Sequence, residues 1–470
     1  MKSSIIITRR LLKQLLLLFA LLVPKFASAY DFMVDGLCYN KNSDGTSVTV
    51  TYMYNPGTSY PNLIELTIPS SVTYEGNTYS VTKIGRKAFY RCGAMTSVEI
   101  PNSVTSIGVD AFYECSGLTS LIIPNSVVSI SSDAFFHCRG ITSLTIGSSL
   151  ESINNAFNFD SDLASITVTG TGGKYDSRDN CNAIIETATN TLVFGCKNTV
   201  IPNTVIEIGD NAFYSCWRLT SLDIPNSVTK IGDAAFYYCT GLTSIDLNSV
   251  TSIGNSAFYN CTALTSITNS NSLSEIGDHA FQNCYGLTSL ELPNTLISIG
   301  ASAFCNCSSL TSMELPNSVT SIGGGAFSGC TNMTSFTMGN KVSEIGQYAF
   351  YNCSGLTTMI IPSTVTSIGT SAFSGCSGLR TIHSQIHNPQ SVEYGNQPFQ
   401  GVLTNHCKLF VPQGTVESYQ FTIPWSDFLN IIEEGGGTAT PIKGDVDGDG
   451  IVTSADIMVI YNILLGQDEE

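Results

Sequence analysis

A repeat of about 23 residues dominates this chain and restricts its possible folds more than any other feature. The dipeptide Ala-Phe occurs twelve times between residues 88 and 373, mostly at intervals of 23. A cysteine follows most of these phenylalanines three residues later. A single repeat of this length cannot bury its own apolar face, so consecutive repeats must stack. The chain is therefore expected to form an elongated solenoid.

Each repeat carries the pattern of a short strand followed by bends. One complete unit, residues 118–138, reads LTSLIIPNSVVSISSDAFFHC. Leu121 and Ile123 show the period of two that is typical of a strand, and Pro124 ends it because proline cannot donate to a strand ladder. The predicted fold class is mainly β, a solenoid of ~23-residue turns with short parallel strands. With strands about 4.8 Å apart, a dozen turns make a rod about 60 Å long.

These units resemble those of the BspA-like leucine-rich repeat family of bacterial and protozoan surface proteins. A second unit, residues 219–239, reads LTSLDIPNSVTKIGDAAFYYC, and the resemblance extends over most of residues 82–399. It implies a leucine-rich repeat solenoid, an extracellular location, and adhesion to host proteins or to other cells. It does not imply a particular ligand, because the outward residues vary freely within the family.

The N-terminus has the order of a secretory signal peptide. Basic residues from Lys2 to Lys13 precede an apolar run from Leu15 to Val23, and the small residues Ala27, Ser28 and Ala29 follow. The run of about nine residues is too short to cross a membrane, which takes about twenty. We therefore expect a protein without a transmembrane segment that is secreted or held at the cell surface.

The sequence predicts six segments. They are a signal peptide (1–29), an N-terminal β cap (30–79), the solenoid (80–400, with an insertion at about 158–200), a C-terminal cap (401–432), a linker (433–443) and a dockerin-like calcium-binding repeat (444–470).

The acidic balance excludes some partners. The formal net charge is −17, and removal of the five basic residues of the signal peptide would make it −22. Nucleic acids and anionic membranes are poor partners for such a surface.

The 16 cysteines allow two interpretations. A secreted chain with many cysteines suggests disulfides, whereas the inward position of most of them suggests buried free thiols that act as small hydrophobic groups. Within the insertion, a hairpin turning at residues 187–190 would place Ile185 opposite Leu192 and Cys181 opposite Cys196. That cysteine pair is the best disulfide candidate. The polar run 176–180 is either a binding loop or a turn that closes a wider coil.

Two outward strips are candidate ligand-binding surfaces. One follows the strand residues and carries acids; the other follows each Ala-Phe and carries tyrosines. Acids and rigid aromatic side chains suit protein binding, but the same strips also fit a solvated sheet whose charges oppose edge-to-edge aggregation. The candidate residues are Glu99, Asp223, Asp246, Glu291 and Glu314 on the first strip, and Tyr113, Tyr214, Tyr237 and Tyr259 on the second.

The C-terminal segment contains a calcium-loop pattern. The spacing of its oxygen-bearing residues supplies the ligands that Ca²⁺ prefers, with Gly450 at the sharp sixth position. The predicted ligands are Asp445, Asp447, Asp449, the Ile451 carbonyl, Thr453 and Asp456. The stretch that follows places Ile457, Ile460 and Leu464 on one helical face.

This loop and its following helix resemble one half of a dockerin, the module that docks onto cohesins in assemblies of polysaccharide-degrading enzymes. Ser454 and Ala455 match the positions that dockerins use to contact cohesin. Dockerins usually have two such loops and this chain has one, which puts cohesin binding in doubt. The resemblance leaves a scaffold role in such an assembly as the alternative to adhesion or protein binding. No catalytic motif is visible, so we do not expect an enzyme.

Overall fold

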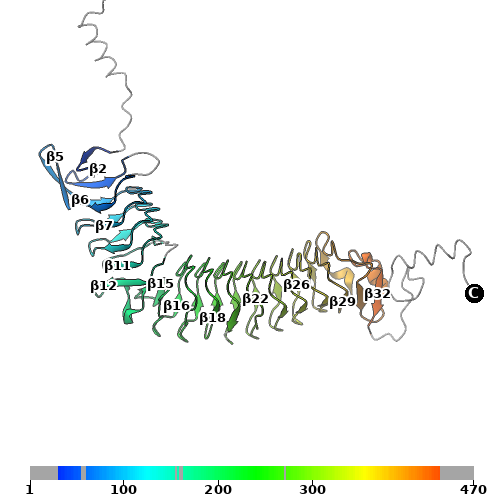
Figure 1. Ribbon diagram of the computed structural model, residues 1–470. Coiled ribbons are helices and arrows are strands. Elements are labelled where there is room, and N and C mark those ends of the chain that lie inside the picture. The colour runs from blue at the N-terminus through cyan, green and yellow to red at the C-terminus, as the bar shows by residue number, and fades with distance from the viewer. Residues whose placement is uncertain (1–29, 54–59, 154–155, 158–161, 269–270, 435–470) are drawn as a thin grey trace, which may run out of the picture.

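The computed structural model describes residues 30–53, 60–153, 156–157, 162–268 and 271–434. These residues form a long rod of stacked turns that bends once, near β15 (Thr191–Gly195) and β16 (Glu207–Ile208) (Figure 1). The prediction of a mainly β solenoid with parallel strands and turns of about 23 residues is confirmed. None of the helices in the described ranges is long and apolar enough to span a membrane.

Each turn contributes up to two short strands, and these stack into two faces. On the first, here called the outer face, the alternating pattern places every second side chain in the core, as in β9. Its strands are β4 (Glu65–Thr67), β7 (Ser97–Glu99), β9 (Ser120–Ile123), β11 (Ser143–Gly147), β12 (Ser165–Thr169), β18 (Ser244–Asp246), β20 (Ser266–Thr268), β23 (Ser312–Glu314), β25 (Ser335–Thr337), β27 (Thr358–Ile361), β29 (Thr381–Ser384), β31 (Lys408–Val411) and β32 (Asn430–Glu433).

The second face is built from two-residue strands that begin at the Ser-Ile or Glu-Ile of each turn. In the N-terminal arm these are β8 (Ser106–Ile107) and β10 (Ser129–Ile130), which pair in parallel. In the C-terminal arm a separate sheet forms the equivalent ladder. It runs from β16 through β17 (Lys230–Ile231), β19 (Ser252–Ile253), β21 (Glu275–Ile276), β22 (Ser298–Ile299), β24 (Ser321–Ile322), β26 (Glu344–Ile345), β28 (Ser367–Ile368) and β30 (Glu393–Tyr394).

A glycine follows the isoleucine of most of these strands, and the closeness of the turns explains it. A Cβ added to Gly254 would lie 2.6 Å from the backbone carbon of Gly232 in the preceding turn, so only glycine fits there.

The Ala-Phe segment closes each turn and fills its centre. The backbone N–H of Phe236 donates to the carbonyl of Ala257 in the next turn (2.7 Å). The phenylalanine rings are buried and stack parallel, with centroids 5.0 Å apart for Phe236 and Phe258 and 5.1 Å apart for Phe258 and Phe281. We call this column the phenylalanine ladder. It stabilises the interfaces between consecutive turns within each arm and is interrupted between Phe157 and Phe213.

The cysteines form a second column beside the phenylalanine ladder. All 16 are free thiols and 14 are buried, which is the free-thiol alternative of the two that the sequence allowed. In nine turns the S–H donates to the phenylalanine carbonyl of the preceding turn, as from Cys284 Sγ to Phe258 O (3.2 Å). Cysteine therefore serves both as a small hydrophobic group and as a hydrogen-bond donor between turns.

The insertion divides the interior into two hydrophobic cores. It contains β13 (Tyr175–Asp176), the 3-10 turn η1 (Arg178–Asn180), and the hairpin of β14 (Ala183–Glu186) with β15. Ile185 and Leu192 pack into the core of the C-terminal arm, whereas Ile184 packs into the core of the N-terminal arm. The hairpin therefore separates the two arms at the bend.

Both ends of the rod are closed by different structures. At the N-terminus, β1 (Phe32–Val34), β2 (Leu37–Lys41), β3 (Ser47–Thr51), β5 (Ser71–Tyr74) and β6 (Asn77–Ile84) form a mostly antiparallel sheet that continues into β8. At the C-terminus, η2 (Pro389–Ser391), helix α2 (Val416–Gln420) and η3 (Trp425–Asp427) cover the last turns. The Trp425 side chain is fully buried there, and its Nε1–H donates to the Tyr394 hydroxyl (2.7 Å).

Candidate functional site

The five acids of the first predicted strip lie on the outer face with exposed side chains. Glu99, Asp246 and Glu314 end strands β7, β18 and β23, where the preceding residue is directed inward. None of the five carboxylates forms an ion pair with another residue of the described ranges. We call the column of outward residues that contains them the acidic column.

The acidic column is not a continuous sheet. Asp223 and Glu291 lie on turns where no strand forms, and the face breaks there into separate small sheets. Hollows of about 400 and 490 Å³ lie on either side of Glu291, and the second also borders Glu314. At this part of the rod, exposed carboxylates therefore lie next to backbone groups that form no strand hydrogen bonds on the outer face.

The tyrosines of the second strip are packed, in contrast to the acids. Tyr214, Tyr237 and Tyr259 are half-buried and stack in succession, with ring centroids 4.9 and 4.8 Å apart. Burial, followed by the proximity of Tyr214, raises the pKa of Tyr237. Tyr113 stacks in the same way in the N-terminal arm, between Tyr90 and Phe136. These rings are therefore partly exposed, and their stacked faces stabilise the solenoid.

Other exposed acids serve the backbone. Asp210 Oδ1 accepts the N–H of Asp233 (2.8 Å), and Asp233 Oδ1 accepts that of Asn255 (2.7 Å). Asn255 and Asp278 repeat the bond at 2.9 and 2.6 Å. These side chains satisfy N–H groups that the turn leaves open. Within the acidic column, Asp246 does the same, because its Oδ1 accepts the N–H of Asn248 (3.1 Å).

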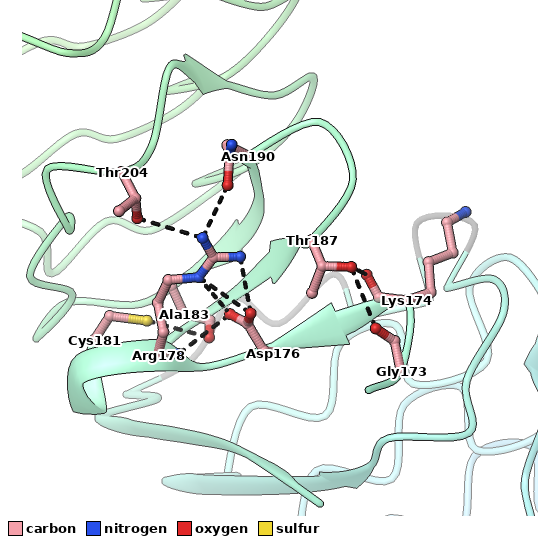
Figure 2. Close-up of polar contacts among 9 residues, drawn as sticks. All are labelled: Gly173, Lys174, Asp176, Arg178, Cys181, Ala183, Thr187, Asn190 and Thr204. Atoms are coloured by element: carbon pink, nitrogen blue, oxygen red, sulfur yellow. Dashed lines mark hydrogen bonds and ion pairs between the residues drawn. The ribbon is translucent and has the colours of Figure 1, made fainter. Parts of the chain in front are cut away.

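The polar run of the insertion is a structural turn centred on Arg178. Its guanidinium makes two contacts with Asp176, from Nε at 2.9 Å and from Nη2 at 2.8 Å. Nη1 donates to Asn190 Oδ1 (2.8 Å) and to Thr204 Oγ1 (3.4 Å), so Arg178 links the insertion to the hairpin turn and to the C-terminal arm (Figure 2). Of the two interpretations of residues 176–180, the structure favours the turn that closes a wider coil.

The expected disulfide between Cys181 and Cys196 is not present. The hairpin forms with Ile185 opposite Leu192 as predicted, but a register shift follows between Ile184 and Ile185. As a result Cys181 faces the core of the C-terminal arm and Cys196 that of the N-terminal arm. Each thiol instead donates to a backbone carbonyl, at 3.6 and 3.4 Å respectively. The prediction assumed a regular ladder, which cannot reveal a bulge.

We expect that replacing Arg178 with methionine lowers the free energy of unfolding by about 1–2 kcal/mol, because the half-buried Asp176 and Asn190 and the exposed Thr204 lose a charged donor. Urea unfolding of the full chain measures the change. The matched control is Arg91→Gln, which removes an exposed ion pair with Glu114 and should change stability by less than about 1 kcal/mol. Equal losses in the two variants would contradict a linking role for Arg178.

A cavity of about 560 Å³ lies at the bend between the two arms. Its apolar wall includes Phe157, Val193 and Phe194, and its polar rim includes Asp133 and Asp210. Burial, with repulsion by Asp110, raises the pKa of Asp133. Sequence reasoning missed this cavity; the available signal was the 56-residue gap between the Ala-Phe dipeptides at Phe157 and Phe213.

The comparisons with known proteins identify the family. A family model for the BspA type leucine-rich repeat region, in six copies, matches residues 82–187, 193–307 and 274–401, which together exceed half of the chain. The chain belongs to this family. Its BspA type repeats are interrupted in the match at residues 188–192, which lie at the turn of the insertion hairpin.

Two solved structures of bacterial leucine-rich repeat proteins are similar to this chain. A leucine rich cell surface protein from Faecalibacterium prausnitzii is 28% identical, with 75% of this chain and 94% of that one covered and a TM-score of 0.45. A leucine-rich repeat protein from Bacteroides ovatus is 25% identical, with 86% and 100% covered and a TM-score of 0.44. No curated protein matches the chain.

Several predicted features of this BspA type protein lie outside the described residues. They are the signal peptide (1–29), most of the linker, and the whole dockerin-like repeat with its calcium ligands from Asp445 to Asp456 and its cohesin positions Ser454 and Ala455. Among the residues that the structure describes, no group of three or more histidine, cysteine, aspartate or glutamate side chains could hold a metal ion.

Proposed function

We propose that this BspA type repeat protein is a non-catalytic protein-binding module that acts outside the cell or on its surface. The observation that carries the proposal is the acidic column, whose exposed carboxylates have no ion-pair partner among the described residues. Its carboxylates lie on an open face without the desolvation that general acid–base catalysis uses, which favours binding over catalysis. The ligand that suits this surface is a protein with a basic patch, such as a host matrix protein or a protein of another cell surface.

The acidic column can be tested with two triple variants of equal charge. We expect Asp246→Asn, Glu291→Gln and Glu314→Gln together to weaken capture of a protein ligand about tenfold or more, because unpaired charges steer and orient the partner. Binding is measured with residues 30–470 on a sensor surface, against the ligand recovered from extracellular proteins.

The control for this test removes the same number of charges from the second face. Glu275→Gln, Glu344→Gln and Glu393→Gln alter exposed acids on β21, β26 and β30. We expect this variant to bind like the wild type. If both variants weaken binding equally, the effect comes from net charge and not from the acidic column. If the first variant binds like the wild type, the acidic column does not bind the ligand.

We also propose that residues 444–470 bind Ca²⁺ through Asp445, Asp447, Asp449, the Ile451 carbonyl, Thr453 and Asp456, because the spacing of their oxygens matches a calcium loop. The alternative function, a scaffold in a dockerin and cohesin type polysaccharide-degrading assembly, rests on Ser454 and Ala455 of this repeat. Capture that persists in EDTA and requires residues 80–400 supports the binding module. Capture of a cohesin that requires calcium and residues 444–470 supports the scaffold.

A further inference from the structure

The C-terminal cap exposes large apolar side chains at the end of the rod. Phe421 and Ile423, on the segment between α2 and η3, are 75% and 79% exposed, the highest values among the large apolar side chains of the described residues. Leu403 and Leu429 of the same cap are also exposed, and the Leu429 N–H donates to the carbonyl of Thr404 (3.4 Å). We call Leu403, Phe421, Ile423 and Leu429 the cap patch.

The position of the cap patch is unusual for a solenoid. The end of a repeat array normally needs a polar outer surface to remain soluble, and clustered exposed apolar side chains mark places where another surface docks. The final strand adds to this open end, because β32 pairs with β31 and with no other strand of the described ranges.

The chain itself continues beyond the C-terminal cap. Helix α2, which leads to Phe421, packs against β32, and the Gly414 N–H donates to Glu433 Oε1 (2.9 Å) at the end of that strand. The remaining residues, 435–470, therefore start at the end of β32 that lies near Gly414, whereas Leu429 precedes the other end of this strand. Their sequence holds Ile457, Ile460 and Leu464 at helical spacing, an apolar stripe that needs a partner.

We propose that residues 456–466 pack their apolar stripe against the cap patch and cover the C-terminal end of the solenoid. The connecting stretch of about 21 residues spans up to roughly 70 Å when extended, so it reaches the patch easily. Tethering raises the effective concentration of the segment to about the millimolar range. A second copy of the chain at micromolar concentration would compete poorly, which favours docking within one chain. This inference does not depend on the proposed ligand binding.

Hydrogen exchange of residues 30–470 in calcium-containing buffer tests the proposal. We expect the amides of 456–466 to exchange about tenfold or more slowly in the wild type than in Phe421→Ser, Ile423→Ser, since undocking exposes them to solvent. The control is Val200→Ser, which changes a side chain that is 69% exposed on the insertion. It should exchange like the wild type.

A reciprocal variant keeps the cap intact. Ile460→Ser, Leu464→Ser should speed exchange of residues 421–428 about threefold or more by uncovering the cap patch, while β31 remains protected. Identical exchange of 456–466 in the wild type and in Phe421→Ser, Ile423→Ser would overturn the proposal. A second result would also overturn the proposal. If the wild type sediments as a dimer, Phe421→Ser, Ile423→Ser sediments as a monomer, and exchange of 456–466 is the same in both, the cap patch joins two copies of the chain.

Discussion

Replacing Phe258 with alanine is expected to lower the free energy of unfolding by about 3–5 kcal/mol, the largest effect of any single substitution considered. Its ring is fully buried and stacks on Phe236 and Phe281 at 5.0 and 5.1 Å. Removal leaves a cavity shared by two interfaces between turns, and the backbone bonds on both sides limit its collapse. Urea or thermal unfolding of residues 30–470 measures the loss.

The neighbouring position supplies the control for this substitution. Tyr259 stacks on Tyr237 at 4.8 Å but is only half-buried, so Tyr259→Ala should lower the free energy of unfolding by about 1 kcal/mol. Comparable losses in the two variants would mean that the phenylalanine ladder contributes no more than the tyrosine strip, contrary to the structure.

The buried thiols of the native protein are expected to react with a thiol reagent far more slowly than those of the unfolded chain at pH 8. Burial is the first cause of their low reactivity and raises the pKa of Cys330 from its ordinary value of 9.0 to about 12. A rise of this size in the pKa lowers the fraction of reactive thiolate at Cys330 about 1000-fold at pH 8. Cys305, which is only half-buried, should react first. Titration with and without denaturant measures both rates.

The same titration counts the free thiols. Unfolded protein should yield all 16 without a reductant; a smaller number would restore the disulfide alternative. The raised pKa also sets the pH dependence of stability. Because the folded state holds the thiol protons more tightly, this contribution is complete below pH 9 and is lost as the pH rises from there toward the raised pKa. Stability should therefore fall in alkaline buffer.

The repeat made the general architecture predictable. The recurring Ala-Phe and the Leu-x-Ile pattern before proline define which side chains point inward, and Leu121, Ile123 and Phe135 are all buried as expected. The exposed acidic column followed from the same alternation, because residues between inward positions of a strand must point outward.

Features that arise between repeats could not be predicted in this way. The register shift in the hairpin moved Cys181 and Cys196 to different cores, and no sequence period signals a bulge. The thiol hydrogen bonds depend on which carbonyl the preceding turn presents to each cysteine. The cavity at the bend exists because the insertion separates Phe157 from Phe213, and its shape depends on packing between segments distant in sequence.

The central claim is that a protein ligand binds the outer face of the solenoid. Hydrogen exchange of the ligand complex, compared with the free protein, tests this most directly, because a bound surface exchanges more slowly. We predict slower exchange on the outer face around Asp246, Glu291 and Glu314, and no change in the exchange of the second face. Slower exchange confined to the second face or to residues 444–470 would contradict it.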